Sequence, residues 1–190
     1  MDPLEFLKEK IEKAPVVKVG GYEYFVNPFQ GVSEPLAPAL IEGVTKELVK
    51  RVNVKDVDVI ACVEAIGIGI GYSVAVQSRK PVAVVRKKEF PIENKLAVEK
   101  VTGYGRGKMF VYGDFKGKRV LVVDDVLSTG GTLVSVINAL RKKGAEIVGA
   151  IVVMERGHGR EKVKEKTGID VRSLCRVTIT NGRPVAKIER

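Results

Sequence analysis

The chain has 190 residues, of which 45% are apolar and 29% are charged, with a formal net charge of +10. This length and balance predict a single soluble globular domain with a sizeable core. The longest apolar runs are interrupted by Glu64 and Glu155, so we expect no membrane-spanning segment. The first ten residues, MDPLEFLKEK, mix acids and lysines with few apolar residues and are no secretory signal, which makes the cytoplasm the expected location.

The predicted elements alternate between helices and strands. The first helix begins after Asp2 and Pro3, a residue pair typical of a helix N-terminus. Strands at 16–19 and 22–26, a helix over 36–48, a strand at 57–63, a helix ending near 78 and a strand at 82–86 follow. After a long glycine-rich segment come a strand at 120–123, a helix to 143, a strand at 146–154, a short helix at 159–167 and strands at 171–180 and 184–188. Such repeated strand-helix-strand units predict an α/β fold with a doubly wound parallel sheet.

The stretch VLVVDDVLSTGGT, residues 120–132, combines features that rarely occur together. Its apolar start is typical of a strand buried on both faces. Asp124 and Asp125 then repel each other and lose solvation if buried. Such a pair does little to stabilise a fold, so a purely structural role is disfavoured. Hydroxyls and glycines follow, with Thr132 the expected N-cap of the next helix. Free backbone amides at a helix N-terminus favour a bound anion such as phosphate.

Two other polar segments follow strands of the predicted sheet, namely residues 64–67 and 86–88. Ligands bind at the carboxyl ends of strands in such sheets, so the three segments are expected to meet there. Two nucleotide-binding classes are excluded by their motifs. Gly107-Lys108 lacks the first glycine and the hydroxyl of GxxxxGK[ST], and Tyr72 stands where GxGxxG needs its last glycine.

The segment VVDDVLSTGGT, residues 122–132, resembles the signature with which type I phosphoribosyltransferases bind phosphoribosyl pyrophosphate (PRPP). The resemblance implies that Asp124 and Asp125 are catalytic residues that accept hydrogen bonds from the ribose hydroxyls. It also implies that the loop after them holds the ribose and the 5-phosphate, through Ser128, Thr129, Gly130, Gly131 and Thr132.

Further segments resemble the purine enzymes of this family. CVEAIGIGIG, residues 62–71, is similar to the pyrophosphate loop, which implies that Glu64, Ala65, Ile66 and Gly67 bind pyrophosphate, although Ile66 replaces the usual arginine. Arg86 and Lys88 are the implied cationic ligands of the same group. MERGHGREKV, residues 154–163, is similar to the adenine enzymes, and APVVKVGGYEYFVNPF, residues 14–29, to the archaeal hypoxanthine/guanine subgroup.

The resemblance implies a purine salvage enzyme that converts PRPP and a purine base, hypoxanthine or guanine, into a nucleoside 5′-monophosphate and pyrophosphate. Mg²⁺ is the implied cofactor, bound mainly through PRPP or pyrophosphate, with no metal ligand assigned to the protein. The alternatives are an adenine phosphoribosyltransferase and a regulator that senses PRPP or purines without turnover. A homodimer or higher homo-oligomer is the implied assembly.

The resemblance also divides the single domain, residues 1–190, into functional parts. Residues 1–35, with C-terminal segments, are expected to form a small hood over the base, where Phe25 and Val26 are the implied base contacts. Residues 87–115 are expected to form a flexible lid that carries Arg106 and Lys108 over the site.

Two remaining features have simpler interpretations. No RNP-like aromatic motif, zinc-finger spacing or helix-turn-helix accompanies the basic residues, so we expect no specific nucleic-acid partner. Cys62 and Cys175 lie far apart in predicted strands, and buried thiols are favoured over a disulfide or a metal pair.

Overall fold

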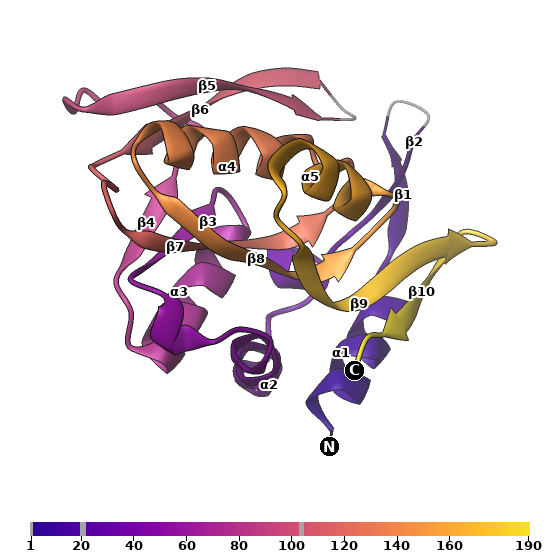
Figure 1. Cartoon of the computed structure of the whole chain (residues 1–190). Helices are drawn as coiled ribbons and strands as arrows, with labels where there is room; N and C mark the ends of the chain where they lie inside the picture. Colours follow the sequence, from indigo (N-terminus) through magenta and orange to yellow (C-terminus); the bar gives the residue numbers. More distant parts are fainter. Residues whose placement is uncertain (1, 20–21, 103–104) are drawn as a thin grey trace.

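The computed structural model describes residues 2–19, 22–102 and 105–190, and the side chains of these residues except those at 19, 22, 100–102, 105 and 106. At its centre lies a six-stranded sheet in the order β10-β9-β8-β7-β3-β4 (Figure 1). Its strands are β3 (Val59–Val63), β4 (Val82–Val85), β7 (Arg119–Leu127), β8 (Glu146–Glu155), β9 (Val171–Thr180) and β10 (Arg183–Ile188). All neighbours pair in parallel except β10, which is antiparallel to β9 at one edge. The predicted parallel α/β sheet is confirmed.

Helices cover both faces of this sheet. They are α1 (Pro3–Glu12), α2 (Pro38–Lys50), α3 (Gly67–Ser78), α4 (Gly131–Lys142) and α5 (Gly159–Thr167). In Figure 1, α4 and α5 lie above the sheet and α2 and α3 lie below it, while α1 packs beside the β9–β10 hairpin. Within the described ranges, no helix is both long enough and apolar enough to cross a membrane.

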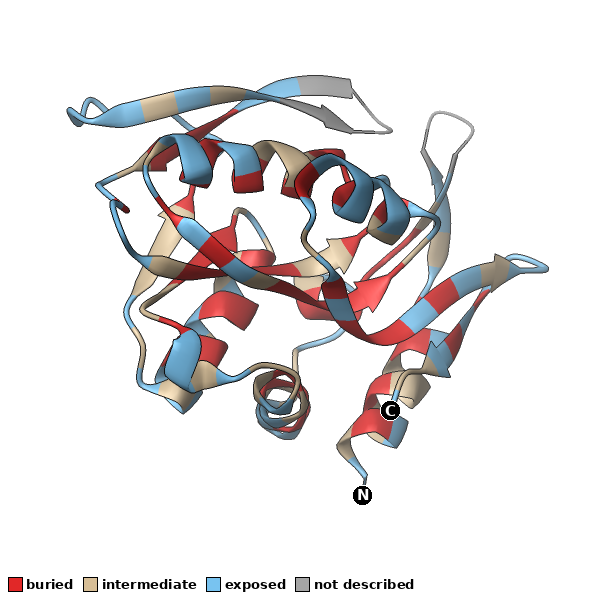
Figure 2. Cartoon of the chain, in the orientation of Figure 1, coloured by how far each residue is buried: buried red, intermediate tan, exposed pale blue. Residues whose placement is uncertain are grey.

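The two faces of the sheet bury separate hydrophobic clusters. Along β7, Leu121 and Val123 pack with α2 and α3, whereas Val120 and Val122 pack with α4. Because side chains alternate along a strand, an apolar run is needed to fill both clusters. Figure 2 shows this pattern as buried residues on the sheet and on the helix faces that contact it.

Two antiparallel hairpins lie outside the central sheet. One joins β1 (Val16–Val19) and β2 (Tyr22–Phe25), followed by the 3₁₀ helix η1 (Pro28–Gln30). The other joins β5 (Lys95–Thr102) and β6 (Gly105–Tyr112) and lies along α4 (Figure 1). A second 3₁₀ helix, η2 (Val54–Asp56), precedes β3.

Several predicted boundaries were wrong, three of them near the cavity or the helices beside it. β7 does not end at the two acids but continues to Leu127, because its hydrogen bonding with β8 extends that far. Thr132 is not an N-cap: α4 begins at Gly131, and its N-cap is Gly130 at φ +75°, without a side-chain cap. A side chain at Gly130 would approach the backbone oxygen of Gly159 to 2.7 Å, so close packing sets this helix start. α2 starts at Pro38 rather than near Leu36.

The two cysteines are buried free thiols, as predicted. Burial raises the pKa of Cys62 to about 11 and that of Cys175 to about 12. Both thiols are therefore protonated at neutral pH and behave as core residues.

Candidate active site

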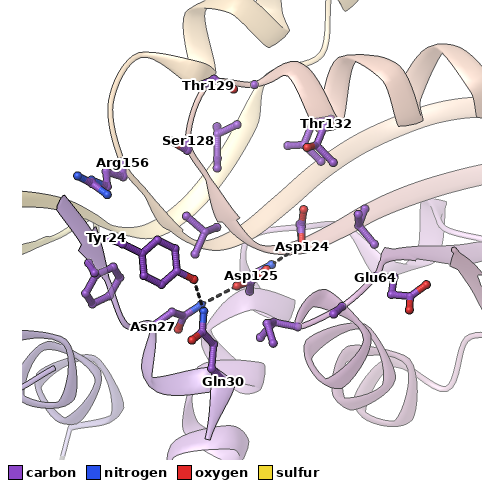
Figure 3. Close-up of a pocket in the computed structure, with 18 of the residues that line it drawn as sticks. Tyr24, Asn27, Gln30, Glu64, Asp124, Asp125, Ser128, Thr129, Thr132 and Arg156 are labelled. Atoms are coloured by element: carbon purple, nitrogen blue, oxygen red, sulfur yellow. Dashed lines mark hydrogen bonds between the residues drawn. The ribbon is translucent and has the colours of Figure 1, made fainter. Parts of the chain in front are cut away.

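A cavity of about 420 Å³ opens at the carboxyl ends of β3 and β7 (Figure 3). The β1–β2 hairpin and η1 contribute one wall, and the segments after β3, β4, β7 and β8 contribute the others. The lining residues are Tyr24, Phe25, Asn27, Gln30, Val63, Glu64, Ala65, Ile66, Lys87, Asp124, Asp125, Val126, Leu127, Ser128, Thr129, Gly130, Thr132, Leu133 and Arg156. Segments far apart in the sequence therefore meet at the edge of the sheet where the sequence predicted a ligand site.

The two signature acids lie in the middle of this cavity. Asp124 is only 7% exposed, and its Oδ1 accepts a hydrogen bond from the backbone N–H of Asp125 at 2.9 Å. Its carboxylate packs directly on Gly67, where an added Cβ would come within 2.6 Å of Oδ1. Asp125 accepts a hydrogen bond at Oδ2 from Nδ2 of Asn27, at 2.6 Å. The paired carboxylates are thus held by three different segments of the chain.

The loop after β7 forms a cradle of hydroxyls and backbone amides. Ser128, Thr129, Gly130 and Thr132 line the cavity at the start of α4, whereas Gly131 does not. The N-terminal end of α4 carries partial positive charge, which favours an anion. Gly159, at the start of α5, braces this loop: a Cβ there would lie 2.2 Å from the backbone oxygen of Ser128. The close packing of Gly159 against Ser128 therefore supports the cradle.

The loop after β3 faces the same cavity. Glu64, Ala65 and Ile66 line it, while Gly67 lies behind them against Asp124. The Glu64 carboxylate accepts a hydrogen bond from the backbone N–H of Lys87 at 2.7 Å and lies 3.2 Å from Nε of Arg86. The Glu64–Ala65 peptide bond is cis.

Neither of the predicted cationic ligands, Arg86 and Lys88, lines the cavity. Lys87, which lies between them and was not predicted, does. Arg86 instead lies over the ring of Phe90, 5.2 Å from its centre, besides its contact with Glu64. Lys108 is exposed and outside the lining, and the side chain of Arg106 falls outside the described residues.

The cavity has further lining residues near β2 that the sequence did not predict. Phe25 lines the cavity, but Val26 is buried beside it and does not. Asn27, Gln30 and Arg156 also line it and were not predicted as site residues. Asn27 could have been suspected from its position before Pro28, since Asn-Pro often initiates a turn.

Hydrogen bonds tie these lining residues to the β1–β2 hairpin and to one another. Gln30 Nε2 donates to the Tyr24 hydroxyl (Figure 3), and Arg156 Nη2 donates to the backbone oxygen of Glu23 at 2.9 Å. The backbone N–H of Arg156 also donates to the oxygen of Leu127 at 2.8 Å. Arg156 therefore joins β2 to β7, the strand that carries the signature acids.

The carboxylates at the site do not form a metal cage by themselves. Among the residues that the structure describes, no group of three or more His, Cys, Asp or Glu side chains is placed to hold a metal ion. Mg²⁺ usually keeps several waters and binds through one or two carboxylates plus substrate phosphates. The two acids beside an anion cradle fit that mode of binding.

Paired acids and a glycine-rich anion cradle on a doubly wound sheet define the class of the type I phosphoribosyltransferases. A model of the phosphoribosyl transferase domain matches residues 34–181. The chain belongs to this family.

Relatives and solved structures agree with that membership. Two hypoxanthine/guanine phosphoribosyltransferases are each 41% identical to this chain. That of Methanothermus fervidus aligns with 94% of this chain and 95% of its own length, and that of Methanothermobacter marburgensis with 95% and 94%. The crystal structure of adenine phosphoribosyltransferase from Thermoanaerobacter pseudethanolicus has a TM-score of 0.76 at 25% identity, covering 91% of this chain and 99% of that chain. The predicted resemblance is thereby confirmed.

Proposed function

We propose that this protein is a purine salvage enzyme that transfers the phosphoribosyl group of PRPP to hypoxanthine or guanine. The products are a nucleoside 5′-monophosphate and pyrophosphate. The observation that carries this proposal is one cavity shared by the two acids, the anion cradle and the hood. Relatives about 40% identical over nearly the whole chain carry the hypoxanthine/guanine name.

The acids and the cradle are assigned to the ribose 5-phosphate part of PRPP. Carboxylates accept hydrogen bonds from vicinal hydroxyls, and the amides and hydroxyls of residues 128–132 suit a phosphate dianion. Breaking the anomeric C–O bond builds positive charge on the ribose ring. Asp124 and Asp125 stabilise that charge because they lie in a partly buried site of low dielectric.

The pyrophosphate leaving group is assigned to the loop at residues 64–67 and the basic residues after β4. Lys87 already lines the cavity, and Arg86 and Lys88 flank it in sequence. Mg²⁺, bound with PRPP, would neutralise charge on the departing oxygens. Ile66 supplies no charge where related loops carry arginine. In this chain the cations after β4 therefore provide a larger share of the positive charge that faces pyrophosphate.

The base is assigned to the hood end, where Phe25 and Arg156 line the cavity. A guanidinium has only hydrogen-bond donors. A donor matches the carbonyl oxygen at position 6 of hypoxanthine and guanine, whereas adenine carries an amino group there. Because adenine also has ring-nitrogen acceptors, and because Arg156 Nη2 already donates to the backbone oxygen of Glu23, the choice of a 6-oxopurine rests on the hypoxanthine/guanine relatives.

Closure over the site is assigned to residues 87–115. An oxocarbenium-like centre is open to attack by water, so a lid over the cavity protects the reaction. The proposed location is the cytoplasm, and the proposed assembly is a homodimer that packs through α3.

The experiment is an assay of the purified protein with PRPP, MgCl₂ and each of hypoxanthine, guanine and adenine. We expect nucleotide from the first two, with kcat/KM for adenine lower by about 100-fold or more. The control is the double variant Asp124→Asn, Asp125→Asn, which we expect to fold and to lose nearly all turnover. Activity with adenine alone would support the adenine alternative. A lack of any product, together with sequence-selective DNA binding at physiological salt, would support the regulator instead.

A further inference from the structure

Asn27, from the segment that leads into η1, contacts the acid pair from a distant part of the sequence. Asn27 is 3% exposed and lies just before η1. Its Nδ2 donates to Oδ2 of Asp125 at 2.6 Å, across 98 positions of sequence (Figure 3). This bond joins the wall assigned to the base to the strand assigned to the ribose.

The orientation of the Asn27 amide is fixed by a second hydrogen bond. Its Oδ1 accepts from the backbone N–H of Phe29 at 2.9 Å, as the N-cap of η1. An N–H group requires an acceptor, so the oxygen must face Phe29 and the NH₂ group must face Asp125. The Asn27 backbone also contributes, since its carbonyl accepts from the N–H of Gln30 at 3.0 Å. The donor is therefore held in place before any ligand binds.

We infer that Asn27 is a positioning residue for the phosphoribosyl transfer. By donating to one oxygen of Asp125, it fixes the rotation of that carboxylate and keeps it an acceptor for a ribose hydroxyl. A carboxylate held in place needs less reorganisation when charge develops on the ribose ring. This inference rests on the proposed function and adds to it a residue that the signature motif does not contain.

The chain contains the same hydrogen-bonding unit at a place remote from the cavity. Asn53 is the N-cap of η2, its Oδ1 accepts from the backbone N–H of Lys55 at 3.3 Å, and its Nδ2 donates to Oδ2 of Asp56 at 2.6 Å. Neither Asn53 nor Asp56 lines the candidate active site. Comparing the two asparagines separates a role in the reaction from the general value of capping a 3₁₀ helix.

The experiment measures kcat, both KM values and the unfolding midpoint for Asn27→Ala and Asn53→Ala. We expect kcat of Asn27→Ala to fall about 10- to 100-fold, equally for hypoxanthine and guanine. Asn53→Ala should keep the native rates. Equal rates for the two variants would overturn the inference. A rise in the KM for the base with unchanged kcat would also overturn the inference, as would a decrease in kcat of different size for the two bases. Either result would mean that Asn27 contacts the purine. If the native protein formed no nucleotide, the proposed function would fail first.

A second variant keeps the cap and removes only the donor. Asn27→Asp retains an oxygen that accepts from Phe29 but places a second carboxylate against Asp125. Two adjacent carboxylates repel each other, so the pair keeps one proton up to a higher pH than an isolated carboxyl group does. We expect its rate relative to the native protein to rise as the pH falls, because a protonated acid can donate to Asp125. The other ionisable groups that line the cavity are Tyr24, Glu64, Lys87, Asp124 and Arg156, and both proteins share them. A ratio independent of pH would contradict the positioning role.

Discussion

At the scale of single residues, the site depends on a close contact between a glycine and a carboxylate. Gly67 starts α3, and its missing side chain leaves room for Asp124. An added Cβ would lie 2.6 Å from Asp124 Oδ1 and 3.2 Å from its Cα, closer than ordinary contacts allow. The loop assigned to pyrophosphate and the acid assigned to ribose are thus packed as one unit.

Gly67→Ala should therefore weaken PRPP binding. Relieving the clash requires a shift of either the loop or the acid, so we expect the KM for PRPP to rise by about 10-fold or more, since small misplacements in a site are costly. Gly69→Ala is the matched control: it lies in the same helix with nothing within 4 Å of the added Cβ. It should keep the native KM and gain some helix stability. Steady-state kinetics over a range of PRPP concentrations measures both, and equal KM values would contradict the contact.

Residues that are consecutive in the sequence could be located at the cavity from local sequence, and their role in binding PRPP stays a prediction. The acids and the cradle at 124–132 form one continuous motif, which lines the cavity except at Gly131. Asn27 and Arg156 were not predicted, because their roles come from contacts across the fold, with Asp125 and with Glu23. Arg86 and Lys88 followed the correct strand, but side-chain direction left only Lys87 in the lining, and sequence does not show that direction.

At the scale of elements, an ion pair fixes the starting ends of β3 and β7. Arg119 donates from its backbone N–H and from Nη2 to the Asp58 carboxylate, both at 2.9 Å, and its carbonyl accepts from the Asp58 N–H at 2.8 Å. Hydrogen bonds from the side chain and backbone of Arg119 lower the pKa of Asp58 to about 2. The pair holds the two central strands in register at the end opposite the cavity.

Removing this pair should destabilise the protein in a pH-dependent way. A carboxyl with a lowered pKa contributes stability above its ordinary pKa of 3.8, and this is lost as the pH falls toward 2. We expect Arg119→Met to unfold at a lower temperature than the native protein at neutral pH, with the difference shrinking below about pH 4. Thermal unfolding followed by circular dichroism measures it. Lys166→Met, which breaks the exposed pair with Glu165, serves as the control with little effect. If the difference in unfolding temperature between the native protein and Arg119→Met were unchanged at pH 2, it would not come from the ion pair with Asp58.

The segment proposed as a lid contains both anchored and exposed parts. Met109 and Val111 are buried in the cluster that includes α4, so the second strand of the hairpin belongs to the core. Residues 87–95 are all exposed, and they follow the strand whose end reaches the cavity. Local sequence showed the charge and glycine of this segment but not the packing of β6, because that packing involves α4, about 30 positions further along.

We therefore expect ligand-dependent protection within residues 87–95 rather than along the whole hairpin. Trypsin should cut the free protein at Lys87, Lys88 or Lys95, and saturating PRPP with Mg²⁺ should slow these cuts. Lys116, exposed in the turn before β7 and outside the cavity lining, provides an internal control whose cleavage rate should not change. Mass spectrometry of the fragments over time gives each rate. Equal rates with and without ligand at the three lysines would contradict the proposed lid.

At the scale of the whole molecule, the surface of α3 differs from that of the other helices. Its sequence, GIGIGYSVAVQS, contains no charged residue, whereas each of the other α-helices carries at least two. Ile70 and Val74 are buried against the sheet, yet Tyr72 is 50% exposed and Val76 is 78% exposed, one turn apart on the outer side. A helix apolar on both sides is usually covered on both sides. This is the surface on which we base the proposed homodimer.

The position of α3 connects this surface to the site. The helix begins at Gly67, so a partner packed on its outer face would also support the loop at 64–67. We expect the native protein to be a dimer and Val76→Glu to dissociate it, because the interface would bury an unpaired carboxylate. Val185→Glu, at an apolar residue 45% exposed on β10, should leave the dimer intact. Light scattering coupled to size-exclusion chromatography measures the mass, and kinetics at the same concentrations measures the KM for PRPP, which should rise in the monomer. A native monomer, or a Val76→Glu dimer with unchanged mass, would show that α3 is not the interface.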